Sequence, residues 1–461
     1  MPAQTSRRPR RLLTGGVAVG LAVTLVSLSL PAPASAGPAS SRTEGVWRSD
    51  GYGSIIAVSN GVARHYATTA ISCTPAGESR QIGKDRFAGE ERTFSFRVSR
   101  RGAVQHLDGS VGDIRFSRLA ALPTACTAPG STGPLAVFDQ FWTTYDEHYP
   151  FFRAKGIDWN AVRTRYRPQI RPDLTDDQLF DLLSRMIAPL GDAHTAIESE
   201  DRSFQGHRPG TTIPDYPLEN RVRPFIERRD LKGPLTMYAN NRIGYADLPG
   251  GIGYLRPISF LAYASDQPDY EQDKRVLDET LDMILTRQRL AGMRGLIIDL
   301  RVNGGGSDEF GLRLASRLTN KPFLAYLKRA RNDANDPSRF TTPQPIVVRP
   351  AKGTRYTGPI TILTGGSGLS AAETFTQAMM NRSPRPIRIG QNTQGVFSDV
   401  LVRTLPNGWN FIVPNEEFRT PDWRSFDGPG IPPDHRTPVF TAAEFAQNRD
   451  SAFDKALALL R

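Results

Sequence analysis

The sequence predicts an α/β protein whose main domain has a mostly parallel sheet flanked by helices. Apolar runs with the length of buried strands alternate with helix-period patterns in the second half of the chain. Short strand-like runs separated by turn residues fill a distinct region near the N-terminus. With 461 residues, the chain is long enough for more than one domain.

The first 36 residues have the pattern of an export signal. Arginines precede an apolar stretch from Leu12 to Leu30, and Ala34-Ser35-Ala36 follows, so cleavage is expected after Ala36. Glycines and serines dilute the apolar stretch and no cysteine lies near Ala36, which argues against a lasting membrane or lipid anchor. The protein is therefore expected to be secreted or extracytoplasmic. The general secretory and twin-arginine routes both stay open.

Residues 37–126 are predicted to form a small β-rich module, either a sandwich or a barrel. Runs such as SIIAVS and RTFSFRVS alternate with Gly, Asn and Asp turns and carry no catalytic pattern. Cys73 and Cys126, the two cysteines of the chain, flank most of this region. Export would favour a disulfide between them.

Residues 127–200 are predicted to form a three-helix bundle that ends in a histidine segment. The first helix begins near Pro134 and carries an aromatic stripe, the second starts at Asp158, and the third opens with the capping box Thr175-x-x-Gln178. Such a stripe is more often core than ligand site, so the bundle is interpreted as a support for His194. Residues 201–461 are predicted to form the α/β catalytic core.

In this core, the segment GLIIDLRVNGGG predicts a buried strand that ends in three glycines. The run from Leu296 to Leu300 is typical of a central parallel strand. Without Cβ atoms, Gly304, Gly305 and Gly306 can turn their N–H groups outward and let a substrate approach closely. A simple tight turn would explain the glycines equally well, whereas no phosphate-loop pattern is present.

A second segment, TILTGGSGLSAAET, predicts a buried strand, a glycine turn and a helix that begins at Ser370. A serine hydroxyl there would lie beside unpaired N–H groups at the positive end of a helix dipole, which favours nucleophilic chemistry. Ser370-x-x-Glu373 is also a capping box, which needs no chemistry. This segment alone does not decide between the two interpretations.

Taken together, four motifs resemble the serine peptidases of the carboxyl-terminal-processing (tail-specific) and tricorn-core family. They follow one another in the family's order over the chain from about Leu135 onward: DLRVNGGG at 299–306, GGSGLSAAET at 365–374, GQNTQG at 390–395 and GPGIPPD at 428–434. The resemblance implies a crotonase-like (ClpP/crotonase) core, a polypeptide substrate, Ser370 as nucleophile, and an oxyanion hole made by the N–H groups of Gly305 and Ala371.

The family divides by its general base, and this sequence resembles the histidine-dependent, tricorn-like branch. The tail-specific branch places a lysine where this chain has Val396, whereas His194 in LGDAHT matches the base of the tricorn-like branch. An imidazole with a pKa of roughly 6.5 can accept a serine proton near neutral pH. The relay serine of that branch is replaced by Ala193, and the acidic position matches Asp427. Asp192 is the alternative third member.

Two other functions stay open from the sequence. Gly368-x-Ser370-x-Ala372 nearly matches the α/β-hydrolase elbow, which would make the protein an esterase with His435 as base and Asp399, Asp422 or Asp427 as acid. The same fold resemblance also includes retinoid-binding proteins without catalysis, and Ala193 favours that alternative.

The composition predicts no cofactor and no nucleic-acid partner. No CxxC, HExxH or DxDxDG pattern suggests a metal site. Loss of the four signal arginines would lower the formal net charge from +11 to +7, and the remaining basic residues are scattered rather than striped with aromatics. The residues from 201 to 241 are too few for the peptide-binding domain that tail-specific members often insert. Substrate choice and oligomeric state are not readable from the sequence.

Overall fold

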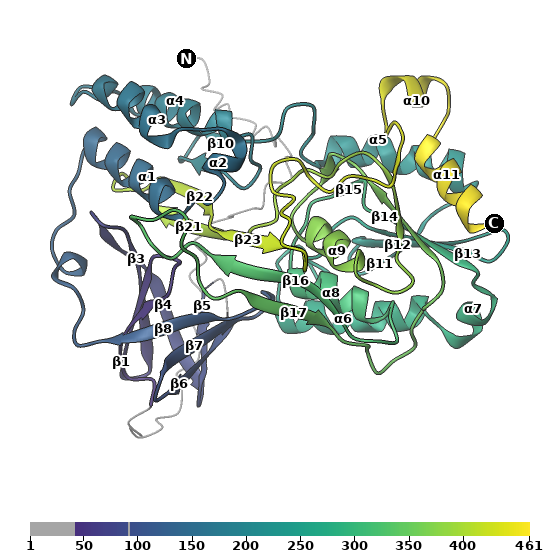
Figure 1. Cartoon of the computed structure of the whole chain (residues 1–461), viewed down its shortest axis with the longest axis horizontal. Helices are drawn as coiled ribbons and strands as arrows, with labels where there is room; N and C mark the ends of the chain where they lie inside the picture. Colours follow the sequence, from purple (N-terminus) through teal and green to yellow (C-terminus); the bar gives the residue numbers. More distant parts are fainter. Residues whose placement is uncertain (1–41, 91–92) are drawn as a thin grey trace, which may run out of the picture.

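The structure is a computed structural model that describes residues 42–90 and 93–461. Its polypeptide forms a β-barrel, a helical region above it, and a larger α/β unit beside them (Figure 1). The predicted signal peptide, residues 1–36, lies outside the described residues. Among the described residues, every helix is too short or too polar to cross a lipid bilayer.

The N-terminal β-rich module is a closed barrel of eight antiparallel strands. Strand β1 pairs with both β2 and β8, which closes the sheet on itself. Aromatic side chains, including Trp47, Phe87, Phe96 and Phe116, fill its interior. The strands are β1 (Gly45–Ser49), β2 (Ser54–Ser59), β3 (Val62–Thr68), β4 (Cys73–Gly83), β5 (Arg86–Gly89), β6 (Thr93–Ser99), β7 (Gly102–Leu107) and β8 (Ile114–Leu119).

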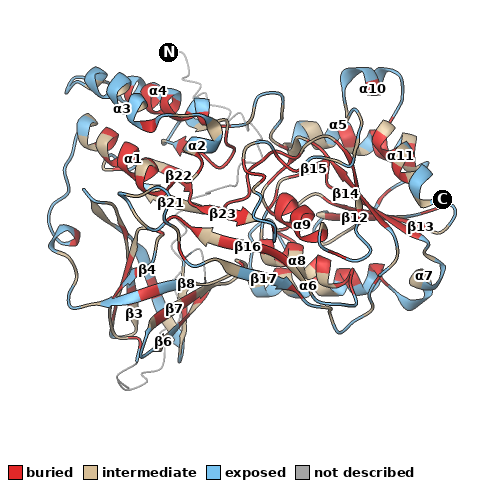
Figure 2. Ribbon diagram, viewed as in Figure 1, coloured by how far each residue is buried: buried red, intermediate tan, exposed pale blue. Residues whose placement is uncertain are grey.

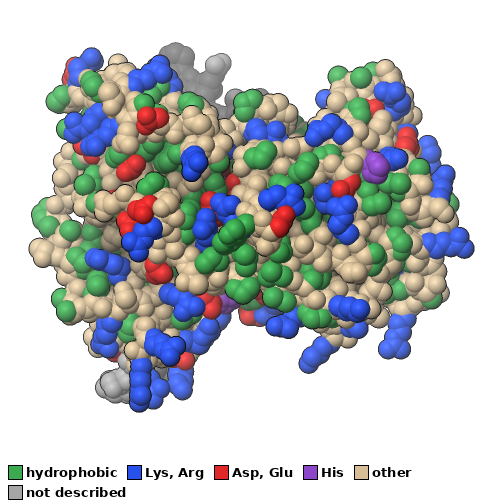
Figure 3. All heavy atoms as spheres, in the orientation of Figure 1, with side chains coloured by type: hydrophobic (Ala, Val, Ile, Leu, Met, Phe, Trp, Pro, Cys, Tyr) green, Lys and Arg blue, Asp and Glu red, His purple; other side chains and the backbone are tan. Residues whose placement is uncertain are grey.

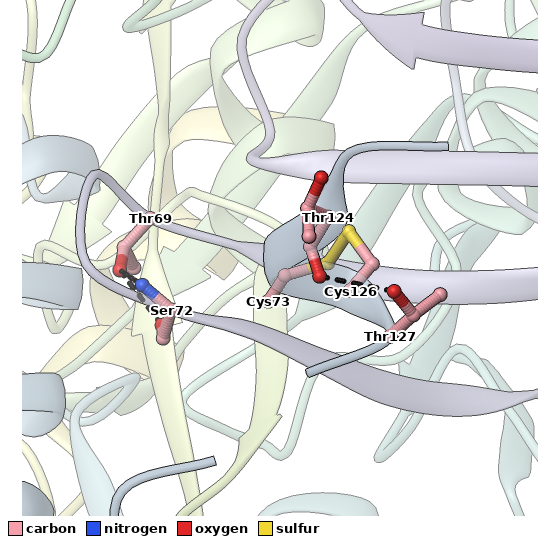
Figure 4. The surroundings of a disulfide bond; sticks show 6 residues. All are labelled: Thr69, Ser72, Cys73, Thr124, Cys126 and Thr127. Atoms are coloured by element: carbon pink, nitrogen blue, oxygen red, sulfur yellow. Dashed lines mark hydrogen bonds between the residues drawn. A yellow bond between two sulfur atoms is a disulfide. The ribbon is translucent and has the colours of Figure 1, made fainter. Parts of the chain in front are cut away.

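A disulfide joins Cys73, at the start of β4, to Cys126 in the short helix η1 (Thr124–Cys126), as the sequence predicts (Figure 4). The bridge attaches the chain that leaves the barrel to the barrel wall. The hydroxyls of Thr69 and Ser72 are 2.7 Å apart in the turn that precedes Cys73.

The three predicted helices form with the predicted caps. Asp158 accepts the Ala161 N–H at the start of α3, and Thr175 accepts the Gln178 N–H at the start of α4. These helices share their hydrophobic core with a sheet of order β10-β9-β22-β21 rather than packing only on one another. The elements are α1 (Pro134–His148), α2 (Phe152–Lys155), α3 (Trp159–Tyr166), η2 (Arg167–Gln169), α4 (Asp176–Ile187), η3 (Ala188–Leu190), β9 (Ala196–Glu198), β10 (Ser203–Gln205), β21 (Val400–Thr404) and β22 (Asn410–Pro414).

The main sheet has seven strands in the order β11-β12-β13-β14-β18-β20-β24, and it is parallel from β13 onward. Its strands are β11 (Thr236–Tyr238), β12 (Ile243–Leu248), β13 (Ile252–Pro257), β14 (Gly295–Asp299), β18 (Ile360–Thr364), β20 (Ile387–Gly390) and β24 (His435–Arg436). The alternation predicted from the sequence is thus present, and Figure 2 shows the central strands buried.

Helices cover both faces of this sheet. Leu296 and Ile298 of β14 pack with side chains of α6, α8 and α9, whereas Ile297 packs with side chains of α5 and α11 on the opposite face. The helical segments are α5 (Tyr216–Ile226), η4 (Glu227–Leu231), α6 (Tyr270–Ile284), α7 (Arg287–Gly292), α8 (Asp308–Ser316), α9 (Ala371–Met379), α10 (Ala442–Ala446) and α11 (Ser451–Leu460).

Two smaller sheets complete the core. An antiparallel sheet of order β17-β16-β23 was not anticipated by the sequence pattern. A short parallel pair, β15 with β19, lies at the ends of the central strands. Their bounds are β15 (Val302–Asn303), β16 (Phe323–Ala330), β17 (Gln344–Val348), β19 (Ser367–Gly368) and β23 (Glu416–Arg419).

The surface is mixed in charge. In Figure 3, Lys and Arg side chains are spread over the visible face with acidic and apolar side chains between them.

Candidate active site

Ser370 lies where the chain turns from the sheet into α9. Its backbone has φ +56° and ψ −121°, a conformation that costs a non-glycine residue on the order of 1–3 kcal/mol. The Ser370 N–H donates to the Val396 carbonyl at 3.0 Å, which helps to hold the turn. Such strain is concentrated at functional sites in proteins.

The short pair β15 and β19 brings the glycine run to Ser370. Asn303 is paired with Gly368, and the Leu369 N–H donates to the Asn303 carbonyl at 3.2 Å. A Cβ placed on Gly305 would lie 2.6 Å from the Ser370 Cβ and 3.2 Å from its Oγ. The close approach of the glycine run that the sequence predicts is therefore present.

The backbone N–H groups near Ser370 differ in whether they already donate a hydrogen bond. The Gly305 N–H donates to Asn303 Oδ1 at 2.8 Å. Among the described residues, no hydrogen-bond acceptor is found for the N–H groups of Gly306 and Ala371. Of the two predicted oxyanion donors, Ala371 is thus available and Gly305 is occupied by a side chain.

The segment DLRVNGGG also has a structural role at its start. Arg301 is buried and donates to Asp299 and to both oxygens of Asp450, the residue that caps α11. Asn303 Nδ2 donates to the Pro257 carbonyl at 2.7 Å. These bonds fix the end of β14, so the glycines leave the sheet in one direction.

Glu373 joins the start of α9 to the segment that follows β20. Its buried carboxylate accepts the N–H groups of Gly395 at 2.7 Å, Val396 at 2.8 Å and Ser370 at 3.3 Å. Burial raises the pKa of Glu373 to about 7. The predicted capping residue therefore also positions the chain beside Ser370.

His194 is buried close to this region. The preceding Ala193 packs against Leu369 and Val396, the neighbours of Ser370 in sequence and in space. The His194 N–H donates to Asp192 Oδ1 at 2.9 Å, and the ring Nδ1 is buried without a hydrogen-bond partner among the described residues. Among the described residues, no hydrogen bond joins the side chains of His194 and Ser370.

Burial sets the protonation of His194. It lowers the pKa of the imidazole, while the charges of Asp192 and Asp399 and a hydrogen bond with the Ser398 backbone act in the opposite direction. The neutral ring, which can accept a proton, is therefore favoured near neutral pH.

Asp427 contacts the segment that contains Val396. It accepts the hydroxyl of Ser425 at 2.8 Å and the N–H of Phe397 at 3.3 Å. Burial and then the nearby charge of Asp192 raise the pKa of Asp427 well above its usual value. No hydrogen bond connects Asp427 to His194 in the described part of the chain, whereas Asp192 belongs to the same turn as His194.

Two residues of the α/β-hydrolase interpretation, His435 and Asp422, make their contacts away from Ser370. His435 lies in β24, where it pairs with Ile389 at the edge of the main sheet. Asp422 is exposed and pairs with Arg424 at 2.7 Å. Across the described residues, no group of three His, Cys, Asp or Glu side chains is arranged as metal ligands would be.

Comparison with known proteins agrees with this geometry. Residues 251–437 match peptidase family S41, and residues 134–188 match the tricorn protease C1 domain. The first match includes the glycine run and Ser370. The part of the chain that carries the glycine run and Ser370 is therefore similar to the serine-type peptidases of family S41.

Two characterised proteins resemble parts of the sequence. The chloroplastic carboxyl-terminal-processing peptidase 2 of Arabidopsis thaliana is 26% identical over 42% of this chain and 34% of its own length. Tricorn protease homolog 1 of Streptomyces coelicolor is 32% identical over 16% of this chain and 7% of its own length. The chain thus spans about a third or less of these relatives.

Two solved structures resemble the fold over a longer range. A protein of Parabacteroides merdae with a provisional peptidase assignment has a TM-score of 0.59 at 26% identity, covering 72% of this chain and 97% of the other. Mature CPAF complexed with lactacystin has a TM-score of 0.52 at 12% identity, covering 71% and 97%. At that identity, the second likeness concerns the fold alone.

Proposed function

We propose that the protein is a secreted serine peptidase that hydrolyses polypeptides through an acyl-enzyme on Ser370, with His194 as general base. The observation that carries the proposal is the strained Ser370 at the start of α9, in contact with Gly305 of the glycine run. A crotonase-like core and export by the N-terminal signal belong to the same proposal.

In the proposed reaction, Ser370 Oγ attacks the carbonyl carbon of the scissile peptide bond while His194 takes the hydroxyl proton. The Ala371 N–H and an N–H of the glycine run stabilise the oxyanion. His194 then gives the proton to the leaving amine, and a water molecule activated by the same ring hydrolyses the acyl-serine. Burial lowers the pKa of His194, so the ring is neutral near neutral pH and can accept a proton.

The third catalytic member is proposed to be Asp427 acting through the intervening segment, with Asp192 as the alternative. Asp427 reaches the Phe397 N–H, and the raised pKa of its carboxyl makes it a weak source of negative charge. Asp192 accepts the backbone N–H of His194 and so orients the turn that carries the ring. Asp427→Asn should therefore cost less activity than His194→Ala.

The test is peptide hydrolysis and fluorophosphonate labelling by the purified protein. Ser370→Ala should abolish both, since removal of a serine nucleophile costs on the order of a millionfold in turnover. Ser316→Ala is the matched control, because its half-buried hydroxyl bonds only the Arg313 carbonyl in α8. Hydrolysis by Ser370→Ala within tenfold of wild type would refute the proposal.

Two alternative functions give different outcomes in the same test. A ligand-binding protein, which Ala193 favours, would show neither labelling nor hydrolysis in the wild type. An esterase of the α/β-hydrolase kind would lose activity in His435→Ala and keep it in His194→Ala.

A further inference from the structure

The loop between β7 and β8 of the barrel, residues 108–113, lies against the α/β unit. Its Val111 side chain is 6% exposed and belongs to the main core cluster, together with Phe310 and Tyr326. In Figure 1 the barrel adjoins the region of β16 and β17. Val111 is thus buried in the core of the α/β unit, while the other residues of the loop are partly exposed.

The first contact of the loop is with the end of the glycine run. Ser307, which directly follows Gly306 and caps α8, donates its hydroxyl to the Gly109 carbonyl at 2.6 Å. The same serine accepts the Phe310 N–H at 3.3 Å. The position of the chain that leaves the glycine run is therefore tied to the barrel.

The second contact is with the buried Lys328, which forms ion pairs with the partly exposed Asp399 and the buried Glu416. Lys328 Nζ donates to the Val111 carbonyl at 2.8 Å and lies 3.0 Å from Asp399 Oδ2 and 3.1 Å from Glu416 Oε1. The Ser110 hydroxyl is 3.4 Å from the same oxygen of Asp399. Asp399 follows Ser398, whose backbone bonds His194, and its charge acts on the His194 ring.

A third contact holds the loop in register. The Gln344 side chain of β17 accepts the Asp113 N–H and donates to the Asp113 carbonyl, both at 2.7 Å. Since neutral side-chain bonds of this kind fix a backbone in one place, the loop has little freedom to shift on the core.

We infer that the barrel loop 108–113 is a positioning element of the peptidase site. It holds the exit of the glycine run through Gly109 and the Lys328–Asp399 pair through Ser110 and Val111. The barrel is then not a detachable module, because the geometry on both sides of the site depends on it. This inference rests on the proposed function for its catalytic readouts.

The sharpest test is Gly109→Val in the full chain. Gly109 has φ +83°, and an added Cβ would already be in van der Waals contact with Ser307 Oγ at 3.4 Å and Tyr270 at 3.6 Å, so the two further methyl groups of valine would crowd Ser307. Gly77→Val is the matched control, since Gly77 is also in the barrel, has φ +92°, and has no atom within 4 Å of an added Cβ. Both variants carry the same kind of backbone strain.

We expect Gly109→Val to lower kcat by about tenfold with little change in KM, because displacement of Ser307 moves the glycine run and oxyanion donors act in the transition state. Gly77→Val should stay within about twofold of wild type. Equal activities in the two variants, at similar losses in Tm, would overturn the inference.

A second arm uses the pH profile, which a purely structural role would not move. The charges that face His194 are those of Asp192 in its own turn and Asp399 after β20. In Asp399→Asn one negative charge is lost and Asp192 remains, so the acidic limb of kcat/KM should move to lower pH. A limb that stays in place would contradict the coupling of Asp399 to His194.

Hydrogen–deuterium exchange separates this inference from the proposed function. Amides of residues 304–310 should exchange faster in Gly109→Val than in Gly77→Val, whether or not the protein is active. If the wild type neither hydrolyses peptides nor reacts with fluorophosphonate, the proposed function fails while this measurement still tests the loop. Identical exchange in both variants would overturn the positioning role.

Discussion

At the scale of the residue, the site depends on a close approach that only glycine permits. Gly305 has φ +78° and lies against Ser370, which itself has a positive φ. Two unusual backbone conformations therefore face one another. Their strain is held by the pairing of β15 with β19 and by the helix that follows Ser370.

Replacement of Gly305 tests this approach. The Cβ of Gly305→Ala would lie 2.6 Å from the Ser370 Cβ, so the serine must move, and a displacement of about 1 Å can cost on the order of a hundredfold in rate. Gly408→Ala is the control, because it also has a positive φ but meets nothing within 4 Å. Comparable kcat/KM values for the two variants would show that the contact is unimportant.

The pH profile tests His194. Burial lowers the pKa of the ring from 6.5, and a protonated ring cannot accept the serine proton. The acidic limb of kcat/KM should therefore have an apparent pKa below 6.5, and His194→Ala should reach the same floor as Ser370→Ala. A limb centred above neutral pH would point to a different base.

At the scale of the element, local sequence patterns correctly predicted helix caps and buried strands. Asp158 and Thr175 cap their helices as expected, and the apolar runs of β14 and β18 are central parallel strands. The sheet β17-β16-β23 was missed because pairing between strands far apart in sequence leaves no periodic signal. For the same reason, the sequence did not predict that the helices share their core with β22.

The site was predictable only in part. Ser370 and His194 follow from motif and resemblance, as does the glycine run. The second role of Glu373 was missed, because a capping box accounts for that residue without contacts to Gly395 and Val396. The Lys328–Asp399 pair was missed because the two residues are far apart in sequence, and no local pattern around a lysine in a strand indicates its ion-pair partner.

Glu373→Gln tests the link between α9 and the Val396 segment. In this variant an NH2 group replaces one carboxylate oxygen, so a hydrogen-bond donor faces backbone N–H donors. This mismatch should cost about 1–3 kcal/mol of unfolding free energy. Turnover should fall as well, since the Ser370 N–H bonds the same segment. Denaturant unfolding and kcat together check this.

The pH dependence of stability gives a second test of Glu373. Burial raises its pKa from 4.5 to about 7, so the folded state favours the protonated carboxyl. This contribution is fully present below the unfolded pKa and is lost as the pH rises from 4.5 to about 7, by up to about 3 kcal/mol. The Gln variant lacks it. The unfolding free energy of the variant should therefore change less than that of the wild type over this range.

At the scale of the whole molecule, barrel and peptidase domain are joined by covalent and noncovalent contacts. The disulfide closes a loop between residues 53 positions apart, and such bridges contribute about 2–4 kcal/mol. Cys73→Ser with Cys126→Ser should lower the unfolding free energy by that amount. Thiol titration of the denatured, unreduced wild type should find no free thiol, and two thiols per chain would refute the bridge.

The position of the bridge also determines what a broken backbone would release. A single cut at any exposed turn between Cys73 and Cys126 would leave the two pieces tied together by sulfur. The closed barrel would keep both pieces paired through its strands. A molecule nicked there would therefore retain its full mass on a non-reducing gel and separate only after reduction.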